Sequence, residues 1–335
     1  MQIAAWGRIG ALAAATALAA CGGGGGGGGL GTVSLKTTDD VIREVDNVAV
    51  AQLLADPSLF VPEDGGAPTA YRVLRGDRTA RPGSGKLTPA AAETVPCPTS
   101  GAYTVEDFTG DFAYVLFGQT LATDSSVTVY DDCREEVEDT RATLNGRVEV
   151  AATSGTAGTV ESPSYFAAVF GSGSTPFRDV LESLSTSQRF TLRVRGRFEG
   201  RQAGTLFEAR DAVSIDIGAS YEGDSISAGL DFGQSDDPLI LTEDSGLGVV
   251  TVDGPIGYAS EFCDDGWVHY TTLQPLHYNA DMGFYDAGEL LIESGSQGVT
   301  VTFLANGDVS YQFANGNSGV IPLADLGTGG GCMAI

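Results

Sequence analysis

Histidine and aspartate residues lie close together in the last third of the chain, where their side chains could ligate a metal ion. The only two histidines, His269 and His277, are near Asp264, Asp265 and Asp281 in the sequence. Imidazole and carboxylate groups are common metal ligands, but the His-Glu-x-x-His spacing of zinc proteases is missing. The simpler interpretation is that both histidines are exposed or half-buried strand residues. We therefore assign no metal site to them.

Pairs of acidic residues are the other candidates for binding a cation. Asp131-Asp132 and Asp236-Asp237 offer the oxygen ligands that calcium prefers. Neither pair lies in a loop with EF-hand spacing. Calcium in such a loop is an open alternative, and we expect no other metal or soluble cofactor.

The candidate nucleophile motifs fail on their spacing. Gly223-Asp224-Ser225-Ile226 is similar to the nucleophile block of GDSL-type esterases, a family that needs a strand-to-helix turn and a later Asp-x-x-His. The nearest match, Asp265-Gly-Trp-Val-His269, has one residue too many. Gly171-Ser172-Gly173-Ser174 lacks the spacing of a nucleophile elbow. A glycosidase needs only two carboxylates, and the 44 acidic residues single out no pair. We predict no catalytic residue.

A stripe of arginines is the remaining feature with chemical character. Residues 189–201 alternate between apolar side chains on one face of a predicted strand and arginines on the other. Arg193, Arg195 and Arg197 could bind a polyanion. However, the next predicted strand carries Glu208 and Asp216, which suit cross-strand ion pairs, and we favour this structural role. The apolar residues are Phe190, Leu192, Val194 and Phe198, and the arginines are Arg189, Arg193, Arg195, Arg197 and Arg201.

Residues 1–20 have the layout of a secretory signal. One cation, Arg8, is followed by an apolar segment from Ile9 to Ala20 that is too short to span a bilayer. We therefore expect a peptidase to remove this segment from an exported protein.

The residues around the expected cleavage point indicate a membrane anchor. Leu18-Ala19-Ala20-Cys21 resembles the lipobox of bacterial lipoproteins, in which the cysteine thiol receives a diacylglycerol and the new terminal amine is acylated. The resemblance implies that Cys21 becomes the first mature residue and that the protein is held in the membrane by its lipid. In that family an aspartate after the cysteine favours the inner membrane, so Gly22 implies the outer membrane. The alternative is an ordinary signal peptide with a chance cysteine.

Eight glycines follow Cys21 and indicate a tether. Glycine-rich chain spans about 5–6 Å × √n, so residues 21–36 would hold the folded part about 20 Å from the lipid. The body is expected to lie outside the bilayer, on the periplasmic side or exposed at the surface.

Four cysteines remain after lipidation. An even number in an exported chain predicts two disulfides, and four cysteines allow three pairings. We favour Cys97–Cys133 and Cys263–Cys332 because each pair falls within one half of the chain. A zinc site is the alternative, although no Cys-x-x-Cys pair is present.

The acidic composition limits the possible partners. The formal net charge is −26, and removing residues 1–20 takes away one arginine and no acid, which makes it −27. Such a charge argues against nucleic acid, and against docking on anionic lipid through a basic patch. It is compatible with divalent cations or with a basic partner.

The strand patterns predict a mainly β protein, as an antiparallel β-sandwich, barrel or extended meander with one short N-terminal helix. Thr37 or Thr38 caps a helix that ends before Pro57, and Val61 to Pro96 is an irregular linker. Short β-branched and aromatic runs separated by turn residues follow, in one β domain, 97–335, which can divide into 97–220 and 221–335. Phe177 to Leu184 fits either a helical turn or a strand.

The last hairpin allows its register to be predicted. Val299, Val301 and Phe303 alternate on one strand, as do Val309, Tyr311 and Phe313 on the next. A two-residue Asn306-Gly307 turn would place these rows on opposite faces of the sheet, so a loop with an odd number of residues, such as 306–308, is favoured.

The C-terminal segment from Gly288 to Gly295 with the following hairpin, and the stretch Thr143 to Val150, resemble uncharacterised proteobacterial β-rich lipoproteins. These patterns cover about a third of the chain and imply no activity. We expect an outer-membrane lipoprotein that acts by binding or structural association in the envelope, with an envelope protein or a polysaccharide as partner. A carboxylate-based glycan hydrolase is the alternative.

Overall fold

The computed structural model describes residues 31–54, 92–153, 156, 158–221, 224–260 and 263–326. The predicted signal peptide, Cys21, most of the tether and Cys332 lie outside these residues. The described chain is mainly β and antiparallel with one α-helix, as predicted. It forms two compact units, one of Pro57–Gly204 and Val213–Ser227 (the middle unit), the other of residues up to Asp56, Thr205–Ala212 and Ala228 onward (the outer unit).

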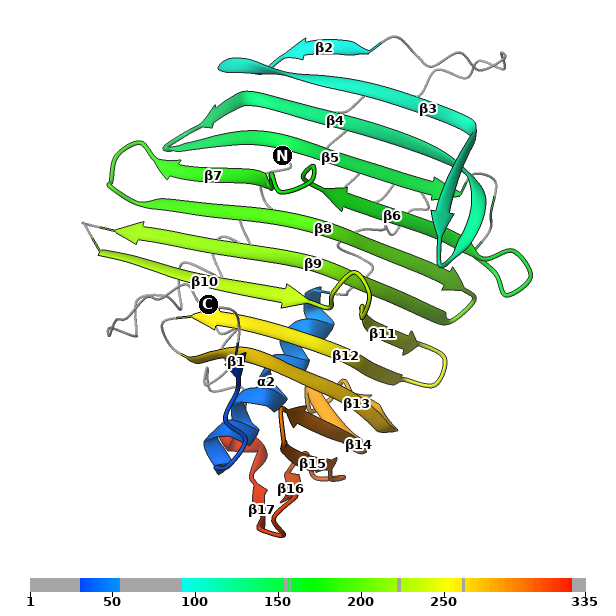
Figure 1. Ribbon diagram of the computed structural model, residues 1–335, viewed down its shortest axis with the longest axis vertical. Helices are drawn as coiled ribbons and strands as arrows, with labels where there is room; N and C mark the ends of the chain where they lie inside the picture. The colour runs from blue at the N-terminus through cyan, green and yellow to red at the C-terminus, as the bar shows by residue number, and fades with distance from the viewer. Residues whose placement is uncertain are drawn as a thin grey trace. The chain divides into compact units, whose positions relative to one another are not determined.

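The middle unit is an antiparallel meander (Figure 1). Strands β6 and β7 lie end to end, because both pair with β5 on one side and with β8 on the other. The ambiguous segment from Phe177 is therefore a strand, and the end of the predicted linker forms β2. The strands are β2 (Glu93–Pro96), β3 (Ser100–Leu116), β4 (Gln119–Val137), β5 (Thr140–Thr153), β6 (Ser164–Phe170), β7 (Phe177–Ser183) and β8 (Arg189–Ala203).

Alternation of side chains gives the middle unit an apolar face. Tyr130, Val148 and Phe177 are buried in one cluster, where Tyr130 lies edge-on to Phe177 with ring centroids 5.9 Å apart. A second buried cluster lies on the other face. Leu116, near the end of β3, is fully buried in this cluster with Ala151 and neighbouring residues.

The outer unit is also antiparallel, apart from β1, which pairs with β13 in parallel. Two strands, β9 and β10, contribute residues to both units. The elements are β1 (Gly31–Thr32), α2 (Thr38–Leu54), β9 (Leu206–Tyr221), β10 (Asp224–Phe232), β11 (Leu239–Asp244), β12 (Val249–Ser260), β13 (Cys263–Asn279), β14 (Phe284–Ser294), β15 (Gln297–Phe303), β16 (Val309–Phe313), β17 (Ser318–Ile321) and the 3₁₀ turn η3 (Leu323–Asp325).

Helix α2 packs its apolar side against the core of the outer unit. Val41, Val45 and Val48 are fully buried, as expected from their helical spacing. The Thr37 hydroxyl accepts a hydrogen bond from the Asp40 amide, and Asp40 Oδ2 accepts one from the Thr37 amide. This reciprocal cap fixes where the helix begins.

The β15–β16 hairpin has a loop with an odd number of residues, as predicted. Val299 pairs with Phe313 and Phe303 pairs with Val309, so both apolar rows face the core. The loop has three residues, 305–307, and begins one position earlier than the loop 306–308 given as the example from the sequence. The Leu304 amide donates to the Asp308 carbonyl, and Gly307 takes the positive φ of 83° that this turn requires.

Candidate functional site

A shallow hollow of about 330 Å³ lies on the outer unit, on the face of β13 opposite to α2. Its lining includes Gln234, Pro255, Trp267, His269 and Glu293. Along β13, Val268 and Tyr270 point into the core, so Trp267 and His269 face outward. Pro255 and Glu293 pair with His269 from the two neighbouring strands. The hollow therefore brings an indole, an imidazole, a carboxylate and an amide to one surface.

The backbone at Trp267 is held firmly. Ser294, which is buried, donates its hydroxyl to the Trp267 carbonyl at 2.7 Å and accepts the Val33 amide at 2.7 Å. Strand β1 runs beside Gly266, where a side chain would lie 2.9 Å from the Gly31 carbonyl oxygen. Gly257, directly opposite Trp267, adds no side chain on that side of the indole. These contacts fix the backbone of Trp267, and the glycine opposite leaves the neighbouring position without a side chain.

The charges at this hollow are acidic or neutral. His269 Nε2 lies 3.9 Å from Asp237 Oδ2, and Glu293 is exposed beside the histidine. Asp237, one of the calcium candidates, thus lies beside an imidazole. Such a surface repels polyanions and can exchange hydrogen bonds with hydroxyl groups.

A second hollow, of about 340 Å³, lies on the middle unit over β3, β4 and β5. Two carboxylates line it, Glu106 and Glu149, and they face each other across Val127 on the intervening strand. Glu149 accepts hydrogen bonds from Arg147 and from the Tyr114 hydroxyl. Burial first, and then Glu149, raise the pKa of Tyr114 to about 12. Glu149 is therefore already bound to neighbouring side chains.

A polar cluster is buried where α2 meets the sheet of the outer unit. Glu44 has no exposed surface, and its two carboxylate oxygens accept hydrogen bonds from the hydroxyls of Tyr258 at 2.5 Å and Tyr270 at 2.6 Å. Arg43 Nε donates to the same carboxylate at 2.9 Å. Burial and the proximity of Glu44 raise the pKa of both tyrosines. The hollow lined by Trp267 lies on the other face of this sheet. The Glu44 cluster therefore acts in docking the helix on the sheet.

The two histidines lie in separate groups. His277 Nδ1 is 2.5 Å from Asp286 Oδ1, and Asn279 donates to the other oxygen of Asp286 at 2.8 Å. These two hydrogen bonds, with that from His277 first, keep the pKa of Asp286 below its usual value. Among the residues that the structure describes, no group of three or more His, Cys, Asp or Glu side chains is arranged to hold a metal ion.

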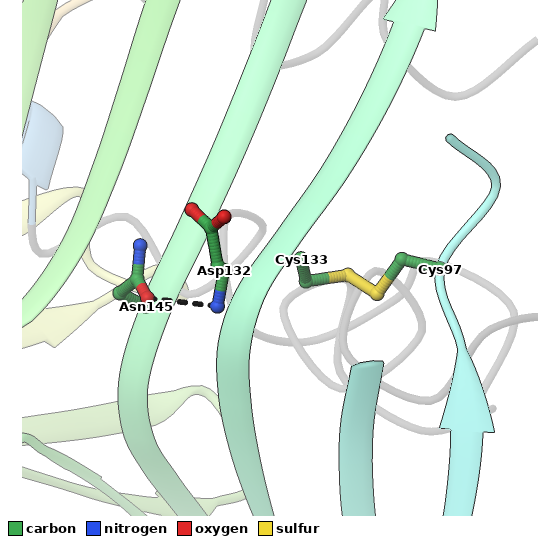
Figure 2. Close-up of a disulfide and its surroundings, with 4 residues drawn as sticks. All are labelled: Cys97, Asp132, Cys133 and Asn145. Carbon is green, nitrogen blue, oxygen red and sulfur yellow. Dashed lines mark hydrogen bonds between the residues drawn. A yellow bond between two sulfur atoms is a disulfide. The ribbon is translucent and has the colours of Figure 1, made fainter. Parts of the chain in front are cut away.

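The predicted disulfide between Cys97 and Cys133 is present, with Cα atoms 5.4 Å apart (Figure 2). It lies beside a bulge of β4, where the Asp132 amide donates to Asn145 Oδ1 at 2.8 Å. The predicted pairing of Cys263 with Cys332 is not tested, because Cys332 is outside the described residues.

The arginine stripe lies on β8 as predicted, with Val194 and Phe198 buried on the opposite face. Two of its arginines pair with acids other than Glu208 and Asp216. Arg197 binds Glu199 of its own strand at 2.5 Å and donates to the Val115 carbonyl. Arg189 contacts Glu182 of β7 at 3.4 Å.

The central part of this stripe includes a pair of like charges. Arg193 lies directly opposite Arg178 of β7, and Arg195 is exposed. Within the described residues, neither Arg193 nor Arg195 forms an ion pair. Arg193, Arg195 and Arg197 therefore do not converge on a single acidic partner.

The remaining sequence motifs fall in strands and loops. Asp224 and Ser225 of the esterase-like motif begin β10, which is a strand setting. Ser172 to Thr175 form a small turn after β6. The sequence patterns did not single out Trp267 or Glu293, although Trp267 lies within Asp265-Gly-Trp-Val-His269.

The one helix that the structure describes lacks the length and apolarity needed to cross a membrane. Comparison with protein-family models, curated proteins and solved structures finds no match for this chain.

Proposed function

We propose that the protein is a lipoprotein of the outer membrane, anchored through Cys21, that binds a partner or a glycan in the cell envelope. Support for the anchor comes from the lipobox-like Leu18-Ala19-Ala20-Cys21 and the glycines that follow it. Several acyl chains, at about 0.8 kcal/mol per buried methylene, make such an anchor effectively permanent.

Binding is favoured over catalysis by the shape and chemistry of the two hollows. Both are shallow depressions on sheet faces. A glycan hydrolase, the alternative, needs a free acid and a free base on either side of the scissile bond. Glu106 and Glu149 come nearest to that arrangement, but Glu149 is engaged by Arg147 and Tyr114. The observation that carries the proposal is the Trp267 hollow, where an aromatic ring and polar groups converge on an open surface.

Membrane fractionation tests the anchor. Cys21→Ser removes the thiol that would be acylated, so we expect this variant to leave the membrane fraction, while the unmodified protein stays with the outer membrane after a carbonate wash. Gly22→Asp is the matched variant, because the lipobox resemblance implies that it stays lipidated but moves to the inner membrane. A Cys21→Ser protein that still fractionates with the outer membrane would show the proposal to be wrong.

A further inference from the structure

We infer that the Trp267 hollow binds an uncharged pyranose sugar from a glycan of the cell's own envelope. The inference rests on the proposed lipid anchor for the location of the ligand, and on the geometry of the hollow for its chemistry.

The side chains of the hollow match the two kinds of surface that a pyranose ring presents. The C–H face of such a ring is apolar and flat, and an indole ring such as that of Trp267 offers a large, rigid surface for it to stack on. The hydroxyl groups around the ring edge need both donors and acceptors. Gln234 and His269 can donate, and Glu293 can accept.

The charge of the hollow selects against anionic sugars. Glu293 is exposed at its edge, and Asp237 lies against His269. A sulfated or uronic acid sugar would place its negative charge beside these carboxylates and would be repelled. The site therefore suits neutral hexoses and N-acetylated amino sugars.

The backbone around Trp267 is also ordered before a ligand binds. Ser294 ties the Trp267 carbonyl to the Val33 amide through two hydrogen bonds of 2.7 Å. Because the strands around Trp267 are already paired, little backbone ordering is needed on binding, which favours affinity.

The location of the hollow limits which glycans can reach it. Strand β1 pairs Gly31 with Gly266 and Thr32 with Trp267, so the chain passes the hollow as it enters the fold. Gly31 is ten positions after Cys21, so ten Cα-to-Cα steps connect the two residues. This connection spans about 17 Å on average for a glycine-rich chain and at most about 35 Å when fully extended. An anchored protein therefore keeps the hollow within a few tens of ångströms of its own membrane.

Tryptophan fluorescence tests this inference directly. The two tryptophans of the chain are Trp6, in the predicted signal peptide, and Trp267, so the mature chain carries a single tryptophan, which lies in the hollow. The mature chain 21–335 with Cys21→Ser is titrated with oligosaccharides of N-acetylglucosamine and, separately, with polygalacturonate. We expect a saturable change in emission with the neutral sugar and none with the polyanion. No change with the neutral sugar, or a stronger response to the polyanion, would overturn the inference.

Calorimetric titration of variants tests the location. Trp267→Ala should weaken binding at least about tenfold, as the loss of a central aromatic contact does. Leu273→Ala changes an exposed apolar residue of the same strand and should leave binding unchanged. A thermal unfolding curve like that of the parent protein shows that the Trp267→Ala variant is folded. If that folded variant binds as tightly as the parent protein, the hollow is not the site.

The source of the sugar is distinguished by two further ligands. Peptidoglycan fragments and the delipidated polysaccharide of the outer leaflet both carry pyranose rings, and binding to either supports the inference and identifies the source. Binding to neither contradicts it. These measurements use unlipidated protein in solution, so they succeed or fail independently of the Cys21 fractionation.

Discussion

Glu44 shows how a single polar residue can determine the docking of an element. It lies on the same side of α2 as Val41, Val45 and Val48, fully buried, with both oxygens hydrogen-bonded to Tyr258 and Tyr270 of the sheet. Removing one partner from such a buried charged network typically costs about 3–5 kcal/mol, because the remaining charge is left uncompensated. The network therefore favours one position of the helix on the sheet.

Two buried carboxyl groups lack this compensation. Oδ1 of Asp179 and Oδ1 of Asp211 have no hydrogen-bond partner within the described part of the chain. Burial raises the pKa of Asp179 to about 6 and that of Asp211 to about 8. Asp211 lies in the core of the outer unit, directly opposite Leu239, which is fully buried.

We expect Asp211→Asn to change how stability depends on pH. A carboxyl whose pKa is about 8 when folded and about 4 when unfolded favours folding in its protonated form, so its contribution is complete below pH 4 and is lost as the pH rises to about 8. The neutral asparagine avoids this loss. The variant should be more stable than the parent protein at pH 8, by a few kcal/mol at about 1.4 kcal/mol per pKa unit, with a flatter decline between pH 4 and 8.

Urea unfolding at several pH values measures this difference. Asp216→Asn, an exposed change on the same strand, is the matched control and should follow the parent curve. Parallel pH profiles for Asp211→Asn and the parent protein would contradict the assignment.

Sequence patterns identified few of the residues described above. Glu44 could not be recognised, because a helical pattern places a carboxylate on the solvent side unless its partners are known, and those partners are more than 200 residues away. The burial of Asp211 could not be recognised either, because it depends on strands that are distant in the sequence. Trp267 could have been singled out as the one tryptophan of the mature chain. Of the side chains that join it in the hollow, however, only His269 is near it in the sequence, whereas Gln234, Pro255 and Glu293 come from distant segments.

At the scale of elements, register decides which side chains meet. The parity of the β15–β16 hairpin was predictable because burying both apolar rows requires an odd loop. The stripe on β8 was predictable for the same reason, from strict alternation. The ion pair of Arg189 with Glu182 was not predictable, because these two residues meet only through the register of β7 with β8.

The arginines of β8 should differ in their effect on stability. Arg197→Gln removes an ion pair with Glu199 and a hydrogen bond to the Val115 carbonyl, and we expect a loss of about 1 kcal/mol. Arg193→Gln removes a cation that faces Arg178, so stability should stay the same or rise by a few tenths of a kcal/mol.

Chemical unfolding of the two single variants measures both effects, and binding to an anionic polysaccharide is followed in parallel. We expect neither variant to change that binding. A salt-dependent loss of polysaccharide binding in folded Arg193→Gln would instead make β8 a binding face.

At the scale of the molecule, the chain forms two compact units whose boundaries do not follow a single cut in the sequence. The sequence offers a division near residue 220, whereas the segments Thr205–Ala212 and Val213–Ser227 belong to different units. Each long strand reads as one continuous pattern, so composition alone cannot show that β9 is shared. The early helix α2 belongs to the unit formed mainly by the C-terminal strands, a long-range arrangement that local patterns do not reveal.

The disulfide acts within one of these units. Cys97 and Cys133 are 36 residues apart, and chain-entropy arithmetic for a loop of this size gives about 4 kcal/mol. Such crosslinks are typical of oxidising compartments, and the proposed export of the chain would place it in one. The anchor proposed at Cys21 would attach the outer unit to the membrane through the tether that leads into β1.

Mass spectrometry of the N-terminal peptide tests the central proposal most directly. Trypsin cuts after Arg8 and Lys36 and at no position between them. For protein extracted from membranes, we predict a peptide that begins at Cys21, ends at Lys36, and carries a diacylglycerol on the thiol and a fatty acid on the amine. A peptide that begins at Ile9, or one with an unmodified Cys21, would contradict the assignment of this protein as a lipid-anchored component of the envelope.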